Sequence, residues 1–154
     1  MPNILLTRID NRLIHGQVGV TWVRSLGANL IVVANDDVSK DPLQQKLMSI
    51  TADNSGAGTR FFSLEKTIEI IHKASASQKI FLVVRDIQDT RKLIEGGVPI
   101  MELNLGNLHF SEGKKEFSKK VYLDEQDIID LDFIKSKGVK IYAQDVPNDK
   151  IKNY

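Results

Sequence analysis

Residues 4–18 read ILLTRIDNRLIHGQV and join an apolar strand to an amphipathic helix through a charged turn. The apolar run at its start predicts a strand from Ile4 to Ile9. The helix that follows has apolar residues at helical spacing and is expected to end at Gly27, since glycine suits the left-handed end of a helix. This stretch therefore predicts the first strand and helix of a β-α-β unit. The apolar stripe of the helix consists of Val18, Trp22, Val23 and Leu26.

The same alternation of apolar strands and capped helices continues along the chain. Further strands are predicted at residues 29–34, 59–62, 79–84, 101–105, 121–123 and 139–143. Helices are expected to begin at Asp41-Pro42, Ser63, Asp86 and Asp124, because these residues are good helix caps. Strands separated by helices are typical of a parallel sheet buried on both faces. We predict a single-domain α/β fold with an open, twisted, mainly parallel sheet of about six to seven strands and helices on both faces.

Length and composition limit both the architecture and the function. The 154 residues suffice for one core, so we expect one domain over residues 1–154. Lys and Arg number 21 against 20 Asp and Glu, which leaves no basic field of the kind that binds nucleic acid. The lack of cysteine excludes disulfides and thiolate chemistry. No apolar run is long enough to span a bilayer, and we expect a soluble, cytoplasmic protein.

The charged turn contains a candidate site for phosphoryl chemistry. A neutral imidazole is nucleophilic near pH 7, and His15 lies near a helix N-terminus, where backbone N–H groups favour an anion. Arginine donors match phosphate oxygens two at a time. Asp10 could accept from the second ring nitrogen of His15 and so select the tautomer that attacks. We therefore expect catalytic roles for His15, Arg12 and Asp10, and phosphate binding by Arg8, Ile14 and Gly16.

The same residues also allow a purely structural interpretation. A histidine at the start of a helix can be a cap or a partly buried polar group. Arginines beside an aspartate often form a surface ion pair that contributes little. Spacing alone leaves both interpretations open.

Residues 8–18, RIDNRLIHGQV, closely resemble the active-site signature of the IIB components of the mannose/fructose/sorbose family of the bacterial phosphoenolpyruvate-dependent sugar phosphotransferase system. Later blocks resemble the same family in order and spacing, so that the resemblance covers essentially the whole chain. Within the family, residues 18–22 and 44–48 look most like the N-acetylgalactosamine-specific branch. The later blocks are residues 36–38, 41–44, 97–99, 104–109, 113–114 and 145–147.

The resemblance implies a phosphoryl relay. A phosphorylated IIA protein or domain would phosphorylate His15 on Nδ1, and His15 would pass the group to a sugar entering through the membrane subunits IIC and IID. The sugar would be an amino sugar such as N-acetylgalactosamine, or a mannose-type hexose. Arg12 matches a family arginine and would steady the phosphoryl group, whereas Asn11 and Asn107 stand where many relatives have Asp and Gly. No cofactor or metal is implied, and the subunit would be cytoplasmic and peripherally associated with the membrane transporter complex.

A second candidate segment, residues 106–115, is polar and interrupted by glycine. It is too long for a tight turn, so we predict a loop that borders the site. His109, Ser111 and Lys114 could contact the phosphoryl group or a partner, and ordinary surface or packing roles are the alternative. Of the basic residues, we expect Arg8, Arg12 and Lys114 to face the phosphorylated partner.

Three other patterns have simpler explanations than a functional site. Asp36, Asp37 and Asp41 lack the spacing of a metal site, and Asp41 is better explained as a helix cap. The segment 56–58, Gly-Ala-Gly, precedes a strand and therefore predicts a turn rather than a dinucleotide site. Trp22, at helical spacing from other apolar residues, is expected in the core.

Two further functions remain open on the residues alone. Residues 13–16, Leu-Ile-His-Gly, superficially resemble the Arg-His-Gly motif of histidine phosphatases. Those enzymes have arginine where this chain has Ile14, and only His109 could supply their second histidine. The other possibility is a non-catalytic α/β module that senses an anion or a phosphorylated partner.

Overall fold

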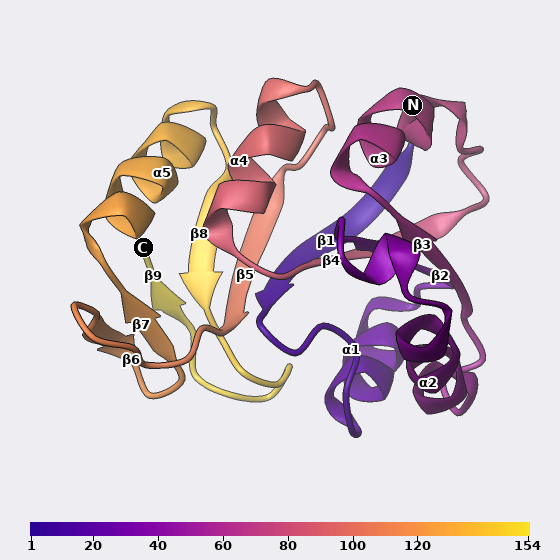
Figure 1. The fold of residues 1–154 in the computed structure, drawn as a ribbon, viewed down its shortest axis with the longest axis horizontal. Helices are drawn as coiled ribbons and strands as arrows, with labels where there is room; N and C mark the ends of the chain where they lie inside the picture. Colours follow the sequence, from indigo (N-terminus) through magenta and orange to yellow (C-terminus); the bar gives the residue numbers. More distant parts are fainter.

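The computed structural model describes residues 1–154 and has a seven-stranded sheet at its centre (Figure 1). Its strands are β1 (Asn3–Asp10), β2 (Leu30–Ala34), β3 (Gly58–Phe62), β4 (Lys79–Val84), β5 (Glu102–Asn107), β8 (Lys140–Ala143) and β9 (Lys152–Asn153). Their order is β3-β2-β4-β1-β5-β8-β9, and all neighbours run parallel except β8 and β9. The predicted α/β fold with a mainly parallel sheet is confirmed.

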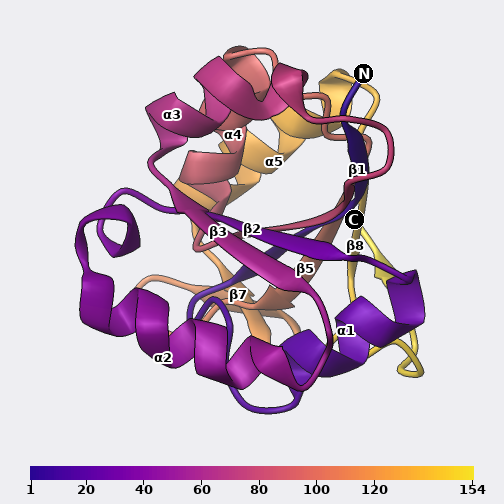
Figure 2. The same ribbon diagram turned by 90° about the vertical axis from the view of Figure 1, so that its right-hand side faces the viewer.

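Five α-helices cover the two faces of this sheet. They are α1 (Val18–Leu26), α2 (Pro42–Asp53), α3 (Leu64–Ile70), α4 (Ile87–Glu95) and α5 (Glu125–Ser136), with short 3-10 turns at Val38–Lys40 and Ile71–Lys73. Helices α1 and α2 lie on one face, and α3, α4 and α5 lie on the other (Figure 2). Alternate residues of the central strands point to opposite faces. Each face therefore has its own core: Leu82 belongs to a cluster of 23 buried residues, and Phe81 to a cluster of 14.

The helix boundaries follow from capping residues that the sequence identifies. The carboxylate of Asp41 accepts from the backbone N–H of Gln44 at 3.1 Å, and Pro42 occupies the first turn of α2. Gly27 ends α1 in the left-handed conformation, with φ of 70°. The predicted starts of α3, α4 and α5 are confirmed in the same way, by side-chain caps at Ser63, Asp86 and Asp124.

The predicted strand at residues 121–123 is present, but it lies outside the main sheet. Strand β7 (Val121–Leu123) pairs antiparallel with β6 (Lys115–Ser118) in a separate hairpin. Toward the main sheet it makes one isolated parallel bridge, between Val121 and Leu108 just beyond β5. The edge position beside β8 is taken by the two-residue β9, whose polar sequence gives no strand signal.

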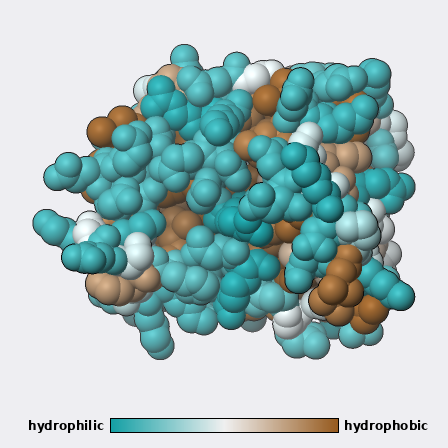
Figure 3. Space-filling view, in the orientation of Figure 1, coloured by the Kyte–Doolittle hydropathy of each residue, from teal (hydrophilic) through white to brown (hydrophobic).

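Helix α2 turns apolar side chains to solvent. Leu43, Leu47 and Ile50 are 65%, 50% and 57% exposed, whereas Met48 and Ala52 are buried against the sheet. The three exposed residues lie at helical spacing and therefore form a second apolar stripe, on the outer side of α2. Figure 3 shows brown side chains gathered over this helix at the lower right of a largely hydrophilic face. None of the helices combines the length and the apolar character needed to cross a membrane.

Candidate active site

The loop between β1 and α1 lies at the carboxyl edge of the sheet, where ligands of open α/β folds bind. Two of its residues have left-handed backbone conformations, Leu13 with φ of 60° and Gly16 with φ of 49°. For a leucine this conformation costs on the order of 1–3 kcal/mol. The side chains of Leu13 and Ile14 are buried in the core beneath the loop, and this burial holds the strained backbone. The backbone at His15 is therefore held in a fixed position.

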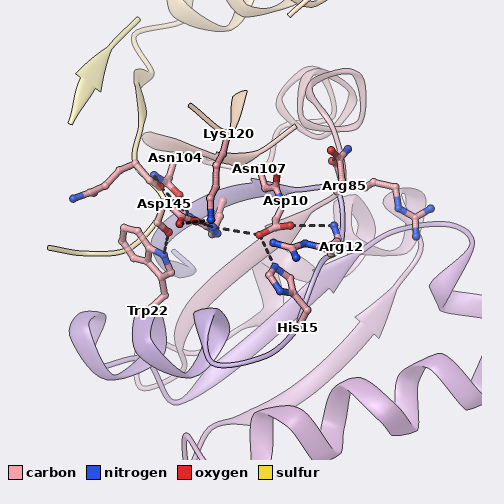
Figure 4. Close-up of polar contacts among 12 residues, drawn as sticks. Asp10, Arg12, His15, Trp22, Arg85, Asn104, Asn107, Lys120 and Asp145 are labelled. Atoms are coloured by element: carbon pink, nitrogen blue, oxygen red, sulfur yellow. Dashed lines mark hydrogen bonds and ion pairs between the residues drawn. The ribbon is translucent and has the colours of Figure 1, made fainter. Parts of the chain in front are cut away.

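His15 uses only one of its ring nitrogens within the protein. Its Nε2 lies 3.0 Å from Oδ2 of Asp10, and its side chain is 20% exposed (Figure 4). No protein atom forms a hydrogen bond with Nδ1. Because an ionised carboxylate can only accept, the contact with Asp10 favours the tautomer that has its proton on Nε2. The lone pair of Nδ1 is then free to attack an electrophile.

Asp10 is the buried centre of the site. Its Oδ1 accepts from the backbone N–H of Arg12 at 3.0 Å, and its Oδ2 contacts both His15 and Nη2 of Arg8, the latter at 3.2 Å. A buried carboxylate is costly unless charged or polar partners compensate it. Asp10 has three such partners, and they fix the direction in which it meets the imidazole.

Arg8 is buried, which corrects the expectation that it faces a phosphorylated partner. Its side chain is only 3% exposed, and burial lowers its pKa despite the opposing effect of Asp10. Nη1 donates to Oδ1 of Asn104 at 2.7 Å and to the carbonyl of Gln144 at 3.1 Å. Arg8 lies directly beside Asn104 in the β1–β5 register, because the two strands pair there. Its guanidinium thus braces Asp10 from inside the protein.

Arg12, in contrast, is exposed next to His15. When the Asn107 amide is turned so that both of its ends are satisfied, its oxygen accepts from Nε and Nη2 of Arg12 at 3.1 and 2.9 Å. Nε2 of His109 lies 3.4 Å from the same Asn107 amide. Only part of the guanidinium is therefore engaged, and its remaining N–H groups are available to an anion.

The two chain segments at the site are tied together by Asn11. Its Oδ1 accepts from the backbone N–H of His109 at 2.6 Å, and its own backbone N–H donates to the carbonyl of Asn107 at 2.9 Å. Its Nδ2 reaches the carbonyl of Arg85, at the end of β4, at 3.5 Å. An aspartate here would lose this last donor. Asn11 therefore connects the His15 loop to both neighbouring strand ends.

A polar cavity of about 300 Å³ opens beside Arg12. His109 lies in its wall, which confirms that the start of the 106–115 segment borders the His15 loop. Ser111 and Lys114 do not take part. The carbonyl of Ser111 accepts from the backbone of Lys114 in a turn, and the Lys114 ammonium pairs with Asp127 of α5 at 3.1 Å. Lys114 therefore does not face the site, contrary to the prediction.

Several contributors were given no role from the sequence. Asn104 and Gln144 hold Arg8, Asn107 holds Arg12, and Lys120 reaches in from the β6–β7 hairpin to pair with Asp145 at 2.8 Å. Asn104, Asn107 and Asp145 lie in the blocks 104–109 and 145–147 that resemble the family, whereas Gln144 and Lys120 carry no such signal. No group of three His, Asp or Glu side chains has an arrangement suited to a metal ion.

Two residues with simpler expected roles behave as predicted. Trp22 is buried in the core beneath α1, and its Nε1 donates to the carbonyl of Asp145 at 2.9 Å. Asp41 caps α2. These contacts explain both residues without a ligand.

Known proteins resemble this chain over most of its length. The family described as PTS system sorbose subfamily IIB component matches residues 4–154. N-acetylgalactosamine-specific phosphotransferase enzyme IIB component 1 of Escherichia coli K12 is 61% identical over 149 residues, which are 97% of this chain and 94% of the relative. The mannose-specific EIIAB component of the same strain is 30% identical over 145 residues, which are 94% of this chain and 45% of that longer protein.

Solved structures extend the likeness to the whole fold. The crystal structure of PTS system N-acetylgalactosamine-specific IIB component 1 from Escherichia coli has a TM-score of 0.96 and 59% identity, with 99% of each chain covered. Family match, sequence identity and fold agree over nearly the full length. The chain therefore belongs to the sorbose subfamily of phosphotransferase system IIB components, phosphotransferases that relay a phosphoryl group during sugar uptake.

Proposed function

We propose that His15 is the phosphoryl acceptor of this IIB component and that it reacts through Nδ1. The observation that carries the proposal is the 3.0 Å contact between its Nε2 and Asp10, which leaves Nδ1 as the free nucleophile. The lone pair of Nδ1 attacks phosphorus, and the bond from phosphorus to the phosphohistidine of the donor breaks. Asp10 stays ionised and stabilises the positive charge that the ring acquires.

Transfer to sugar reverses these events on the same atom. A sugar hydroxyl attacks phosphorus, the P–N bond breaks, its electron pair returns to Nδ1, and the hydroxyl proton passes to solvent. Arg12 holds the phosphoryl oxygens with the N–H groups that Asn107 leaves free. The backbone at Ile14 and Gly16 contributes at close range, because Gly16 has no side chain to obstruct the approach. Arg8 acts behind Asp10 and does not touch the phosphoryl group.

The phosphoryl donor in this proposal is a phosphorylated IIA protein or domain. The mannose-specific relative is named EIIAB, which supports a IIA partner for the IIB chain. The acceptor is a sugar carried by IIC and IID. Residues 1–154 then act as one IIB domain, cytoplasmic and peripheral to the membrane subunits. For the sugar we propose N-acetylgalactosamine, because the relative with that specificity is 61% identical and the mannose-specific one is 30% identical.

The test is to incubate the protein with phosphoenolpyruvate, the general phosphotransferase enzymes and a cognate IIA, and to map acid-labile phosphate by mass spectrometry. The chain has three histidines, so the site must be located and not only counted. A single label on His15 that leaves when N-acetylgalactosamine and the membrane subunits are added supports the relay. His15→Ala should abolish the label, and His72→Ala, at an exposed turn, is the matched control.

Other outcomes separate the alternative functions. Rapid loss of the label to water would favour a phosphatase, although buried Ile14 stands where those enzymes need arginine. No label in the presence of phosphorylated IIA would favour a sensor of anions or phosphorylated partners. A label that leaves to mannose but not to N-acetylgalactosamine would overturn the proposed sugar alone.

A further inference from the structure

A chain of alternating charges runs from the surface of the β6–β7 hairpin to His15. Lys120 pairs with Oδ2 of Asp145 at 2.8 Å, and Oδ1 of Asp145 lies 3.7 Å from Nη2 of Arg8. Nη2 of Arg8 in turn lies 3.2 Å from Oδ2 of Asp10, the oxygen that contacts His15. Figure 4 shows these contacts converging on the site. The chain of contacts therefore links the hairpin to the imidazole, although only Asp10 touches the ring.

Arg8 can occupy the middle of this chain only because the structure leaves space for it. A Cβ on Gly106 would lie 2.1 Å from Cζ of Arg8, so the guanidinium rests directly on the bare backbone of β5. The Trp22 ring lies on another side, with its centroid 5.5 Å from the same Cζ. Asn104 and the carbonyl of Gln144 accept hydrogen bonds from Nη1. This leaves Nη2 for the carboxylates of Asp10 and Asp145.

Nη2 is shared unequally between those carboxylates. Asp10 contacts it at 3.2 Å, and Asp145 stays at 3.7 Å while Lys120 holds its other oxygen. The backbone of Asp145 is fixed by Trp22, so only its carboxylate can adjust. Lys120 is 46% exposed and is therefore the accessible end of the chain. A change in its pairing alters how Arg8 divides its attraction between Asp10 and Asp145.

We propose that Arg8 is a positioning residue for His15, and that Lys120 and Asp145 set how firmly Arg8 holds the carboxylate that orients the ring. This inference rests on the proposed role of His15 as phosphoryl acceptor. When Lys120 is paired, Asp10 is strongly neutralised by Arg8 and attracts the imidazole proton less. When Lys120 is removed, Asp145 draws Arg8 toward itself, and Asp10 attracts that proton more. The ring of His15 should then be held more firmly in the tautomer that has its proton on Nε2.

The test measures the tautomer of the neutral His15 ring in the unphosphorylated protein by ¹H–¹⁵N NMR. The charged groups around the ring are Asp10, Arg8 behind it, and Arg12 on the same loop. Lys120→Gln should raise the ratio of the Nε2–H to the Nδ1–H tautomer about twofold more than Lys119→Gln, which removes the same charge from the adjacent hairpin residue. Asp145→Asn should lower this ratio, since Arg8 then turns wholly to Asp10.

Arg8 variants test the centre of the chain. Arg8→Gln should raise the ratio of the Nε2–H to the Nδ1–H tautomer of His15 about tenfold, and Arg8→Lys should restore part of the difference. If Arg8→Gln does not fold, the exposed Lys120 and partly exposed Asp145 variants still decide the matter. The wild-type spectrum should show the neutral ring with its proton on Nε2.

Equal tautomer ratios in Lys120→Gln and Lys119→Gln, or an unchanged ratio in Asp145→Asn, would overturn the coupling. A neutral ring that carries its proton on Nδ1 would overturn the positioning role. None of these measurements requires phosphorylation. A failure of the relay would appear as wild-type protein that takes no phosphoryl group while the order of tautomer ratios is as expected, so the two failures are distinguishable.

Discussion

Arg8 and Gly106 are in direct contact across neighbouring strands, and a methyl group on Gly106 would lie 2.1 Å from the guanidinium carbon of Arg8. The contact is between a central strand and the strand beside it, under a buried cation with four polar neighbours. A glycine at position 106 is therefore a condition for the charge arrangement behind His15, and not only a feature of the loop that follows.

Gly106→Ala should destabilise the protein by about 2 kcal/mol or more, because the buried guanidinium must move and its partners lose their hydrogen bonds. Urea denaturation measures this loss. Gly58→Ala is the matched control, since a Cβ there would meet Leu30 at an ordinary 3.7 Å. If both variants lose the same stability, the close packing of Arg8 on Gly106 is not the cause of the loss.

Asp10→Asn should slow phosphorylation of His15 by about 100-fold, because an amide neither fixes the ring tautomer nor stabilises the charged ring. Rapid-quench labelling with phosphorylated IIA gives the rate. Circular dichroism must show that the variant is folded, since the substitution leaves Arg8 without its carboxylate. A rate close to wild type would remove Asp10 from the mechanism.

Asn107→Ala should slow transfer about tenfold, which corresponds to about 1.4 kcal/mol, because Arg12 loses the oxygen that orients it. Arg12→Lys should slow transfer more, since an ammonium cannot replace a planar pair of donors. Single-turnover rates distinguish the two variants. An Asn107→Ala protein slower than Arg12→Lys would contradict the view that Asn107 acts through Arg12.

Asp89 gives a pH-dependent prediction away from His15. Burial, with a further contribution from Asp86, raises its pKa to about 6. At pH 3 Asp89 is protonated in both the folded and the unfolded state. Between about pH 4 and 6 it stays protonated to a greater extent in the folded state. The contribution of Asp89 to stability should therefore decrease over this range as pH rises. Asp89→Asn should be more stable at pH 7 by about 1 kcal/mol, after allowance for solvent screening, and no more stable at pH 3.

Asp130, at the contact between α4 and α5, gives the opposite pH dependence to Asp89. Burial opposes the charge of Asp130, but hydrogen bonds from Gln88, Gln126 and Arg91 outweigh it and lower its pKa. The stability that Asp130 contributes is present above about pH 4, which is near its pKa in the unfolded state, and is lost as pH falls further.

Gln88→Glu would place a third carboxylate between Asp127 and Asp130, which Gln88 now contacts at 3.0 and 2.9 Å. It should cost about 2 kcal/mol at pH 7 and less at pH 4. Thermal melts at both pH values check the difference.

Sequence reasoning was most successful where local physics decides the structure. The caps at Asp41, Ser63 and Asp86 need only neighbouring residues, and the buried strands need only runs of apolar side chains. The hairpin partner of β7 was missed because β6 has the sequence Lys-Glu-Phe-Ser, which lacks the apolar run of a buried strand. The apolar residues of α2 were a weak guide to its buried face, because that helix has apolar side chains on both sides.

Within the site, the sequence predicted the loop and the contact between Asp10 and His15, but not what lies behind them. Arg8 was expected to face the phosphorylated partner because it is charged and close to His15. It is buried because β1 pairs with β5 and places Arg8 beside Asn104. Contacts of this kind join residues about a hundred positions apart, and no local pattern reports them.

His15 has one free nitrogen on one exposed side, and this limits the order of events in transport. Donor and acceptor must approach the same atom through the same opening, so they cannot be bound there together. The subunit is then expected to work as a shuttle with ping-pong kinetics, in which release of one partner precedes arrival of the next. Sugar flux would depend on how quickly partners exchange as well as on the chemistry.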